Sequence, residues 1–259
     1  MITSAHNPKI QWVKQLQSRS KERREAGAFV VEGVRLVEEA MQSGWDTWLV
    51  LHIPELGPRS QAVVDGFAER GANIETASPQ VMQAASDTEN PQGLLAVMEI
   101  RSLPVPSSPD LILIPDGVRD PGNLGSMLRT AAAARVSLVC LPEGTVDVFA
   151  PKVVRSAMGA HFRLPLLSAS WDEIGNLLER SEVRLYLAAA EEGIPYTQAN
   201  LRQPLAMIIG GEAAGAGDPA RNIPHQIVHI PMPGKMESLN AAAATAVLLF
   251  EVVRQRSQQ

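Results

Sequence analysis

Short apolar runs alternate with amphipathic stretches through the second half of the chain. Apolar runs predict buried strands, and stretches with an apolar residue every three or four positions predict helices. The predicted strands cover residues 111–114, 137–141, 162–166, 184–189, 205–209 and 227–230. The predicted helices cover residues 124–134, 151–158, 171–180 and 238–254. Such alternation is typical of a parallel sheet with helices on both faces, so we expect an α/β domain.

The first hundred residues show a smaller set of the same patterns. Helices are predicted over residues 8–25, 34–41, 60–70 and 79–85, and strands over residues 29–31, 48–51 and 94–98. Residues 103–109 then contain three prolines, which favour an extended linker over regular structure. We therefore predict a small α/β domain over residues 1–102, a linker over 103–109 and a larger α/β domain over 110–259.

Composition argues against a membrane-spanning or disulfide-bonded protein. The 259 residues contain no apolar run of about eighteen, which a membrane-spanning helix needs, and no signal-peptide pattern at the N-terminus. The single cysteine, Cys140, excludes an internal disulfide, and its apolar surroundings predict a buried thiol. These features predict a soluble cytoplasmic protein without a membrane partner.

Positive charge is concentrated near the N-terminus. Residues 1–35 hold seven basic and three acidic side chains, a local charge of +4 in a chain whose net charge is −5. A basic segment on an acidic protein is typical of a contact with a polyanion, but a solvated helix face has the same composition. Charge alone leaves both interpretations open.

Three loops at the carboxyl ends of predicted strands carry unusual residues, and ligands bind at such ends in parallel sheets. In the loop over 115–123, Asn123 is well placed to cap the following helix. Arg129 lies in the second turn of that helix, about 100° from the buried stripe. It is there available for a charged ligand, although an ordinary surface arginine fits the same position.

The second loop, over residues 208–217, is rich in glycine, which lets a ligand approach the backbone closely. It is not a phosphate-binding loop, because no Lys-Ser or Lys-Thr pair follows its last glycine. It is also not a dinucleotide loop, because Pro224 stops the long helix that such a loop opens. In the third loop, over residues 230–240, Ser238 can cap the final helix, whose first turn of four alanines permits close packing.

Together the three loops resemble the signature motifs of the SpoU (TrmH-type) RNA ribose methyltransferases of the SPOUT superfamily. The matching strings are DPGNLGSMLRTA at 120–131, IIGGEAAGAG at 208–217 and IPMPGKMESLNAAAA at 230–244. The resemblance extends over about residues 111–256. Residues 1–100 resemble the family's substrate-binding domain less specifically, mainly through GAFVVEGVRLVEEA at 27–40 and NPQGLLAV at 90–97.

The resemblance implies a fold, an activity and a site. It implies a deep trefoil knot in the C-terminal domain and a homodimer whose active site uses residues of both subunits. It implies S-adenosylmethionine as the cofactor, held around Gly210, Ile230, Leu239, Met232 and Ala189. It implies a catalytic centre built from Arg129, Asn123, Glu212, Ser238 and Asn240.

Arg129 corresponds to the arginine that the family's usual mechanism treats as the general base. A guanidinium stays protonated in proteins, so it is a poor base. We expect Arg129 instead to bind the target phosphate and to stabilise the developing alkoxide of the ribose.

The leading domain supplies the candidate contacts to RNA phosphates: Arg19, Lys21, Arg23, Arg24 and Arg35. No metal is expected. His225 and His229 flank a predicted strand, but no third ligand lies near them in the sequence.

The expected function is methylation of a ribose 2′-hydroxyl, with 23S-type ribosomal RNA as the favoured substrate because of the leading domain. Transfer RNA is the alternative substrate, and a base nitrogen is the alternative target within the superfamily. An RNA-binding module without catalysis is the alternative outside the enzymes. The sequence does not reveal which nucleotide is modified.

Overall fold

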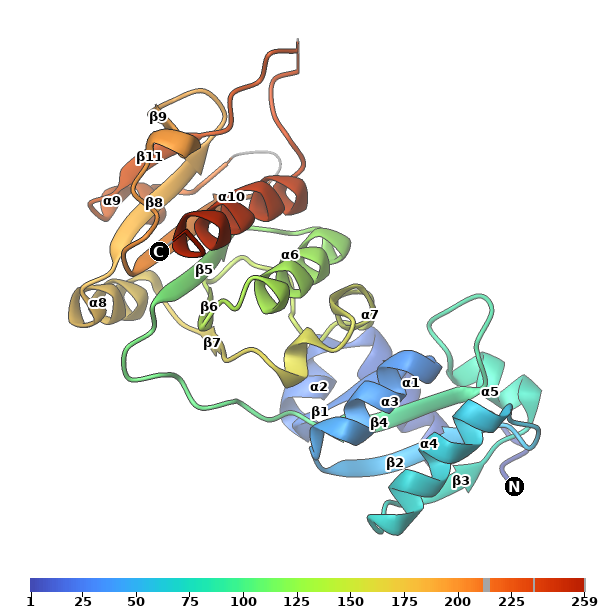
Figure 1. The fold of residues 1–259 in the computed structure, drawn as a ribbon. Helices are drawn as coiled ribbons and strands as arrows, with labels where there is room; N and C mark the ends of the chain where they lie inside the picture. The colour runs from blue at the N-terminus through green and yellow to red at the C-terminus, as the bar shows by residue number, and fades with distance from the viewer. Residues whose placement is uncertain (212–214, 235, 259) are drawn as a thin grey trace. The chain divides into compact units, whose positions relative to one another are not determined.

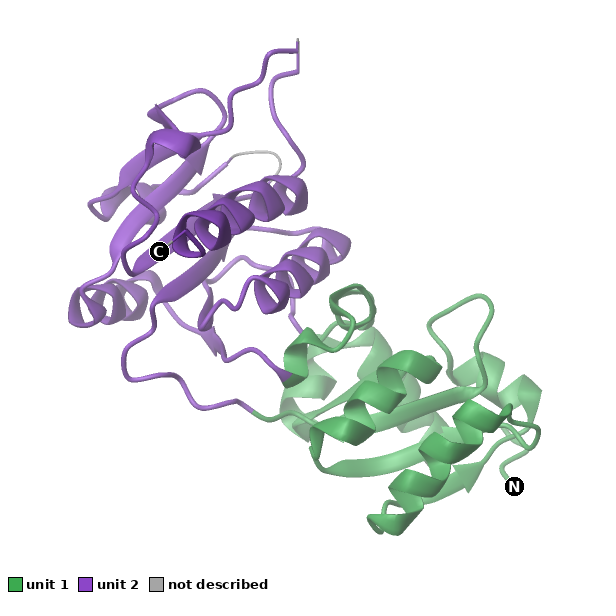
Figure 2. Cartoon of the chain, viewed as in Figure 1, with its two compact units in different colours: residues 1–101, 149–162 green, residues 102–148, 163–259 purple. Residues whose placement is uncertain are grey.

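The computed structural model describes the whole chain except residues 212–214, 235 and 259. Its contacts divide the chain into two units (Figure 2). Unit 1 contains residues 1–101 and 149–162, and unit 2 contains residues 102–148 and 163–259. No helix among the described residues is long and apolar enough to cross a membrane.

Unit 2 is built on a seven-stranded sheet, counted over the described residues, with the strand order β7-β6-β5-β10-β8-β11-β9. Its strands are β5 (Leu111–Asp116), β6 (Leu138–Leu141), β7 (Leu166–Ser168), β8 (Arg184–Ala189), β9 (Ile194–Pro195), β10 (Leu205–Gly210) and β11 (Gln226–His229). All neighbouring strands pair in parallel, so their carboxyl ends lie along one edge. The predicted α/β fold with a parallel sheet is thereby confirmed, and the knot stays a prediction.

Helices cover both faces of this sheet (Figure 1). They are α6 (Pro121–Ala133), α8 (Trp171–Ser181), α9 (Asp218–Asn222) and α10 (Ala241–Arg256). Alternate residues of β5, such as Ile112 and Ile114, share a core cluster with Ile174 and Leu178 of α8. On the opposite face α6 and α10 lie side by side. Burial on both faces explains why the central strands read as continuous apolar runs.

Cys140 lies in β6 and is fully buried, as its sequence context predicts. Loss of hydration raises the pKa of its thiol to about 12. The thiol is therefore protonated at neutral pH and belongs to the core rather than to any site.

Unit 1 contains a four-stranded mixed sheet, again among the described residues, with the order β1-β4-β2-β3. Its strands are β1 (Ala28–Glu32), β2 (Thr47–His52), β3 (Ile74–Thr76) and β4 (Leu94–Glu99). Its helices are α1 (Pro8–Ser18), α2 (Ser20–Ala26), α3 (Val34–Ser43), α4 (Pro58–Glu69), α5 (Pro79–Ala85) and α7 (Pro151–Ala157). β4 pairs antiparallel with both β1 and β2, whereas β3 pairs in parallel with β2.

The helix predicted over residues 8–25 is interrupted at Arg19, whose backbone is extended. The interruption leaves the last carbonyls of α1 without helical partners. Arg23 of α2 supplies partners, because its guanidinium donates to the carbonyl oxygens of Leu16 at 2.5 Å and Gln17 at 3.2 Å. The pair of helices is thus joined by a side chain that is only 4% exposed.

Residues 149–162 lie in unit 1, although the predicted boundaries put them within the second domain. Their aromatic rings explain this position. Phe149 and Phe162 pack on Phe29 of β1, with ring centroids 4.9 Å and 6.3 Å from it, and Phe162 also packs on Trp45. The strand predicted over 162–166 is a 3-10 helix at Ala160–Phe162 followed by β7. Pro165 separates them because it has no N–H for a strand ladder.

Candidate active site

A cavity of about 710 Å³ lies in unit 2 at the carboxyl ends of β8, β10 and β11. Strand ends, the glycine-rich loop, the loop after β11 and the first half of α10 all contribute to its wall. Because parallel strands end at one edge, loops that are far apart in the sequence meet there.

Every residue predicted to hold the cofactor lines this one cavity. Ala189 ends β8, Gly210 ends β10, and Ile230, Met232 and Leu239 belong to the loop that leads from β11 to α10. These residues span fifty positions, and only the strand order brings them together.

Charged side chains at the cavity suit a ligand that carries charges of both signs. The carboxylates of Glu191, Glu192 and Glu237 line it together with the guanidinium of Arg221. S-adenosylmethionine has a sulfonium, an ammonium and a carboxylate, and its adenine suits the apolar floor formed by residues such as Ile209 and Leu248. The residues present therefore fit the expected cofactor.

Gly215 and Ala216 of the glycine-rich loop lie against the end of β10. A Cβ atom on Gly210 would lie 2.1 Å from the carbonyl carbon of Gly215 and 2.2 Å from the nitrogen of Ala216. Real side chains do not approach backbone atoms this closely, so this wall of the cavity requires glycine at position 210. Glu212, predicted to be catalytic, lies outside the described residues.

Asp116 anchors this loop and was not singled out by the sequence. Its side chain is 6% exposed, and its Oδ2 accepts a 2.7 Å hydrogen bond from the backbone N–H of Gly217. The backbone N–H of Gly211 also donates to the carbonyl oxygen of Asp116. A carboxylate directly after a buried strand was the signal that could have identified it.

Two asparagines join the first loop to the third. The side-chain amide of Asn240 donates to Oδ1 of Asn123 at 2.9 Å, across 117 positions of sequence. Asn240 also caps α10, since its own Oδ1 accepts from the N–H groups of Ala242 and Ala243. Both asparagines stand at the N-terminal ends of neighbouring helices, beside the wall formed by Leu239 and Ala241.

Both cap predictions were wrong. Asp120 caps α6, because its side chain accepts from the N–H of Asn123 and Pro121 occupies the first helical position. Asn240, and not Ser238, caps α10, because the helix begins at Ala241. Ser238 is free of the helix and lines the cavity.

Arg129 is not part of the cavity wall. It lies on α6, is exposed, and forms no hydrogen bond or ion pair with the residues that the structure describes. The described part of the chain therefore brings Asn123, Ser238 and Asn240 towards the cavity, while the predicted catalytic arginine faces solvent.

The predicted RNA contacts in unit 1 are divided between α2, with its N-cap residue, and α3, and one of these contacts is buried. The prediction that Arg23 contacts a phosphate was wrong, because Arg23 is buried and binds a carbonyl oxygen of α1. Arg19, Lys21 and Arg24 precede β1, whereas Arg35 follows it on α3.

The described residues hold no group of three or more His, Cys, Asp or Glu side chains placed to bind a metal ion. His225 is instead bound locally, with its Nδ1 2.6 Å from the carbonyl oxygen of Ile223.

Comparisons with known proteins cover both units. Residues 110–250 match the SpoU rRNA Methylase family, and residues 7–96 match the MRM3-like substrate binding domain. The 23S rRNA (guanosine(2553)-2′-O)-methyltransferase RlmP of Bacillus subtilis is 33% identical over 251 residues, which cover 97% of this chain and 98% of that protein. The 23S rRNA (uridine(2479)-2′-O)-methyltransferase of Streptomyces viridochromogenes is 31% identical and covers 98% and 92%.

Solved structures resemble the whole chain. An rRNA methyltransferase from Sinorhizobium meliloti, determined with bound AdoMet, superposes with a TM-score of 0.87 at 29% sequence identity. The superposition covers 98% of this chain and 97% of that one.

Proposed function

The chain belongs to the SpoU rRNA methylase family, and we propose that it methylates a ribose 2′-hydroxyl of 23S ribosomal RNA. It is an S-adenosylmethionine-dependent RNA methyltransferase. The observation that carries the proposal is that the five residues expected around the cofactor line a single cavity at the strand ends. The two relatives act on 23S ribosomal RNA at different nucleotides, so we name the RNA and leave the nucleotide open.

Each wall of the cavity has a proposed role. Backbone groups around Gly210, Ile230 and Leu239 hold the cofactor, which supplies an electrophilic methyl group when bound. Asn240 fixes the start of α10 beside the cavity and orients Asn123 through their shared hydrogen bond. Ser238 and Asn123 then position the target ribose, because alignment of nucleophile and electrophile alone lowers a barrier by several kcal/mol.

The ribose hydroxyl needs help to react, because it is poorly ionised at neutral pH. We assign that help to Arg129 as a stabiliser of negative charge on the target phosphate and on the developing alkoxide. The hydroxyl proton passes to water or to the phosphate, since a guanidinium does not accept it.

A second subunit completes the proposed site. α10 presents an exposed apolar stripe that includes Ala243, Val247, Phe250 and Val253, with Phe250 49% exposed. The spacing of three or four residues puts these side chains on one face of the helix. We propose that the same stripe of a second copy covers it. Arg129, on the adjacent helix α6, then serves the cavity of the partner subunit.

The stripe predicts the effect of a charge at its centre. We expect the protein to be dimeric, and Phe250→Asp to be monomeric at micromolar concentration, because a carboxylate is costly to bury without a partner. Size-exclusion chromatography with light scattering measures the mass. Trp48→Asp is the matched control, because Trp48 is an aromatic residue of similar exposure, 43%, in unit 1. A monomeric unsubstituted protein would contradict the proposal, and so would a dimeric Phe250→Asp variant.

Transfer of radiolabelled methyl groups to separated RNA tests the substrate. We expect label in 23S ribosomal RNA, at one linkage that alkali does not cleave, because a methylated 2′-hydroxyl cannot attack the neighbouring phosphate. Label in transfer RNA alone would overturn the substrate, and label on an alkali-sensitive linkage would move the target to a base. Cofactor binding without label in any RNA would support a module without catalysis.

A further inference from the structure

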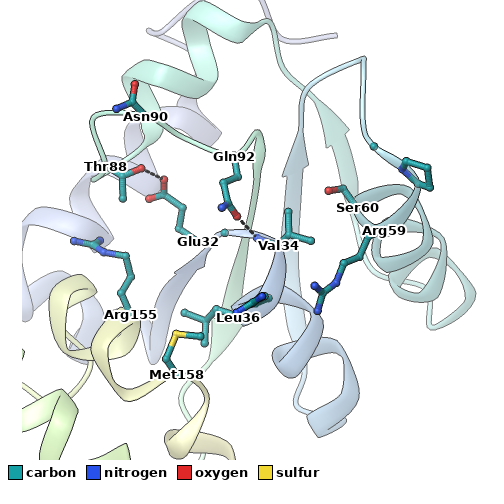
Figure 3. Close-up of a pocket in the computed structure, with 14 residues that line it drawn as sticks. Glu32, Val34, Leu36, Arg59, Ser60, Thr88, Asn90, Gln92, Arg155 and Met158 are labelled. Carbon is teal, nitrogen blue, oxygen red and sulfur yellow. Dashed lines mark hydrogen bonds between the residues drawn. The ribbon is translucent and has the colours of Figure 1, made fainter.

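Unit 1 contains a cavity of its own, of about 680 Å³, far in sequence from the cofactor loops (Figure 3). The turn between β1 and α3, the first turn of α4, residues 88–92 and the end of α7 form its wall. Its volume is within the range of about 300–1,000 Å³ that is usual for sites of small ligands.

Hydrogen bonds fix two walls of this cavity. The buried carboxylate of Glu32 accepts from the Thr88 hydroxyl at 2.6 Å, from the Ser86 hydroxyl and from the backbone N–H of Asp87 at 3.1 Å. The side-chain oxygen of Gln92 accepts from the N–H of Val34 at 2.8 Å and so caps α3 from another loop. Hydrogen bonds within unit 1 thus hold these two walls in place.

Several donors at the cavity have no partner among the described residues. Arg35 is exposed and forms no hydrogen bond or ion pair there. Ser60 is only 7% exposed, yet its hydroxyl has no hydrogen-bond partner in the described part of the chain. Gly57 begins α4 without a side-chain cap, so the N–H groups of that turn lack a local acceptor.

The remaining arginines at the cavity are already held. Arg59 pairs with Glu38, which raises the pKa of the Arg59 guanidinium, and Arg155 pairs with Asp87 at 2.7 Å. Figure 3 shows Arg155 on one side of Val34 and Arg59 on the other. An anion therefore finds a free guanidinium in Arg35 and unused donors at the start of α4.

The floor of the cavity is apolar. Val34 and Leu36 contribute aliphatic side chains, and Met158 contributes a flexible thioether from the end of α7. The amide of Asn90 adds a donor and an acceptor at the rim. A ligand that combines an anionic group with a flat ring bearing hydrogen-bonding edges matches this combination.

We propose that this cavity receives one unstacked nucleotide of the RNA substrate, with its phosphate at Arg35 and the first turn of α4 and its base over Val34 and Leu36. The proposal rests on the proposed function, because it takes the nucleotide to be part of that RNA. Proteins that recognise RNA by sequence or shape commonly accept bases extruded from loops in this way. The cavity then holds the substrate while the cofactor site in unit 2 modifies another nucleotide.

RNA binding by the full chain, measured at several salt concentrations, separates the proposed phosphate contact from the proposed base contact. The probes are 23S ribosomal RNA and transfer RNA, and the variants are Val34→Phe, which fills the floor, and Arg35→Ala, which removes the cation. We expect Val34→Phe to weaken binding roughly tenfold with an unchanged salt slope, because it removes a base contact. We expect Arg35→Ala to lower the salt slope by about 0.7, because it removes one phosphate contact.

Val105→Phe is the matched control, because Val105 is an exposed valine at 41% in the segment after unit 1. Cofactor affinity and the thermal unfolding curve show whether each variant is folded. As a second measurement, a mixture of nucleoside monophosphates should displace RNA from the unsubstituted protein. Inorganic phosphate at equal ionic strength should not.

Each contrary outcome overturns the proposal. If Val34→Phe folds and binds RNA as tightly as Val105→Phe does, the cavity is not occupied by RNA. If phosphate competes as well as the nucleotides do, the site recognises an anion alone. If nucleotides bind the protein without displacing RNA, the cavity takes a free nucleotide. If the cavity variants bind RNA normally and the unsubstituted protein methylates 23S RNA, the cavity proposal fails and the proposed function stands. If the unsubstituted protein methylates no RNA, the proposed function itself fails.

Discussion

Arg129→Ala is expected to lower methyl transfer by about a hundredfold to a thousandfold while cofactor affinity stays close to that of the unsubstituted protein. Loss of one group that stabilises charge in a transition state has this effect on turnover. Cofactor affinity is preserved because Arg129 is exposed on α6 and does not line the cofactor cavity. Single-turnover transfer to saturating RNA and calorimetric titration with S-adenosylmethionine measure the two quantities separately.

Ser126→Ala provides a control on the same helix, because Ser126 is also exposed and one turn away from Arg129. We expect that variant to retain nearly full turnover. An Arg129→Ala protein that no longer binds the cofactor would contradict the assignment, since the substitution would then act on the cavity. Turnover within a few-fold of normal would exclude Arg129 from the chemistry.

The fold of unit 2 follows from local patterns because its strands are buried on both faces. Leu111–Asp116 and Leu205–Gly210 pair with each other at the centre of the sheet, and both stand out in the sequence as apolar runs. The residues expected around the cofactor were implied by the resemblance to the SpoU family, and parallel pairing of the strands is what brings them together. The five cofactor positions share a cavity for that reason.

Helix boundaries depended on details that apolar periodicity does not contain. The buried stripe of α6 begins at Leu124, which drew the predicted start to Asn123, whereas Asp120 followed by Pro121 was the stronger signal. The same reasoning applies to α10, where Asn240 directly precedes the first alanine. In each case the capping residue directly precedes the first residue of the helix, and the polar residue predicted instead does not cap it.

Long-range packing was the part that the sequence could not provide. Phe149 and Phe162 belong to unit 1 because they pack on Phe29, about 120 positions earlier, and no local pattern marks such a partner. Arg23 is a comparable case, since a basic residue in a basic segment is buried only because the break at Arg19 leaves carbonyls for it to bind. The charge pattern therefore misjudged that residue.

Gly210→Ala is expected to lower cofactor affinity at least tenfold and to destabilise the protein by about 1–3 kcal/mol, the usual cost of forcing extra atoms into a packed site. The added Cβ would lie 2.1 Å from the carbonyl carbon of Gly215 and 2.2 Å from the nitrogen of Ala216, and these two atoms belong to backbone that cannot rotate away. The loop must therefore shift from the end of β10. Calorimetric titration with S-adenosylmethionine and thermal unfolding measure the two effects.

Gly217→Ala is the matched control within the same loop. A Cβ there would lie 3.5 Å from Oδ2 of Asp116 and 3.6 Å from Cδ of Pro219, which are ordinary contacts, and its backbone N–H would still reach Asp116. We expect cofactor affinity close to normal. Equal losses in the two variants would show that the specific clash at Gly210 is not the cause.

Mixing the Arg129→Ala and Gly210→Ala proteins tests whether the site is shared between subunits, at a cofactor concentration that leaves the Gly210→Ala cavity mostly empty. Arg129→Ala keeps an intact cofactor cavity, and Gly210→Ala keeps an intact arginine. If Arg129 acts in the partner's cavity, half of the mixed dimers' sites are complete, and random exchange restores about one quarter of normal activity. If Arg129 acts in its own subunit, no complete site forms and the mixture stays inactive. The mixing is then repeated with Phe250→Asp added to both variants. Loss of the recovered activity would show that the subunits pair through the apolar stripe of α10.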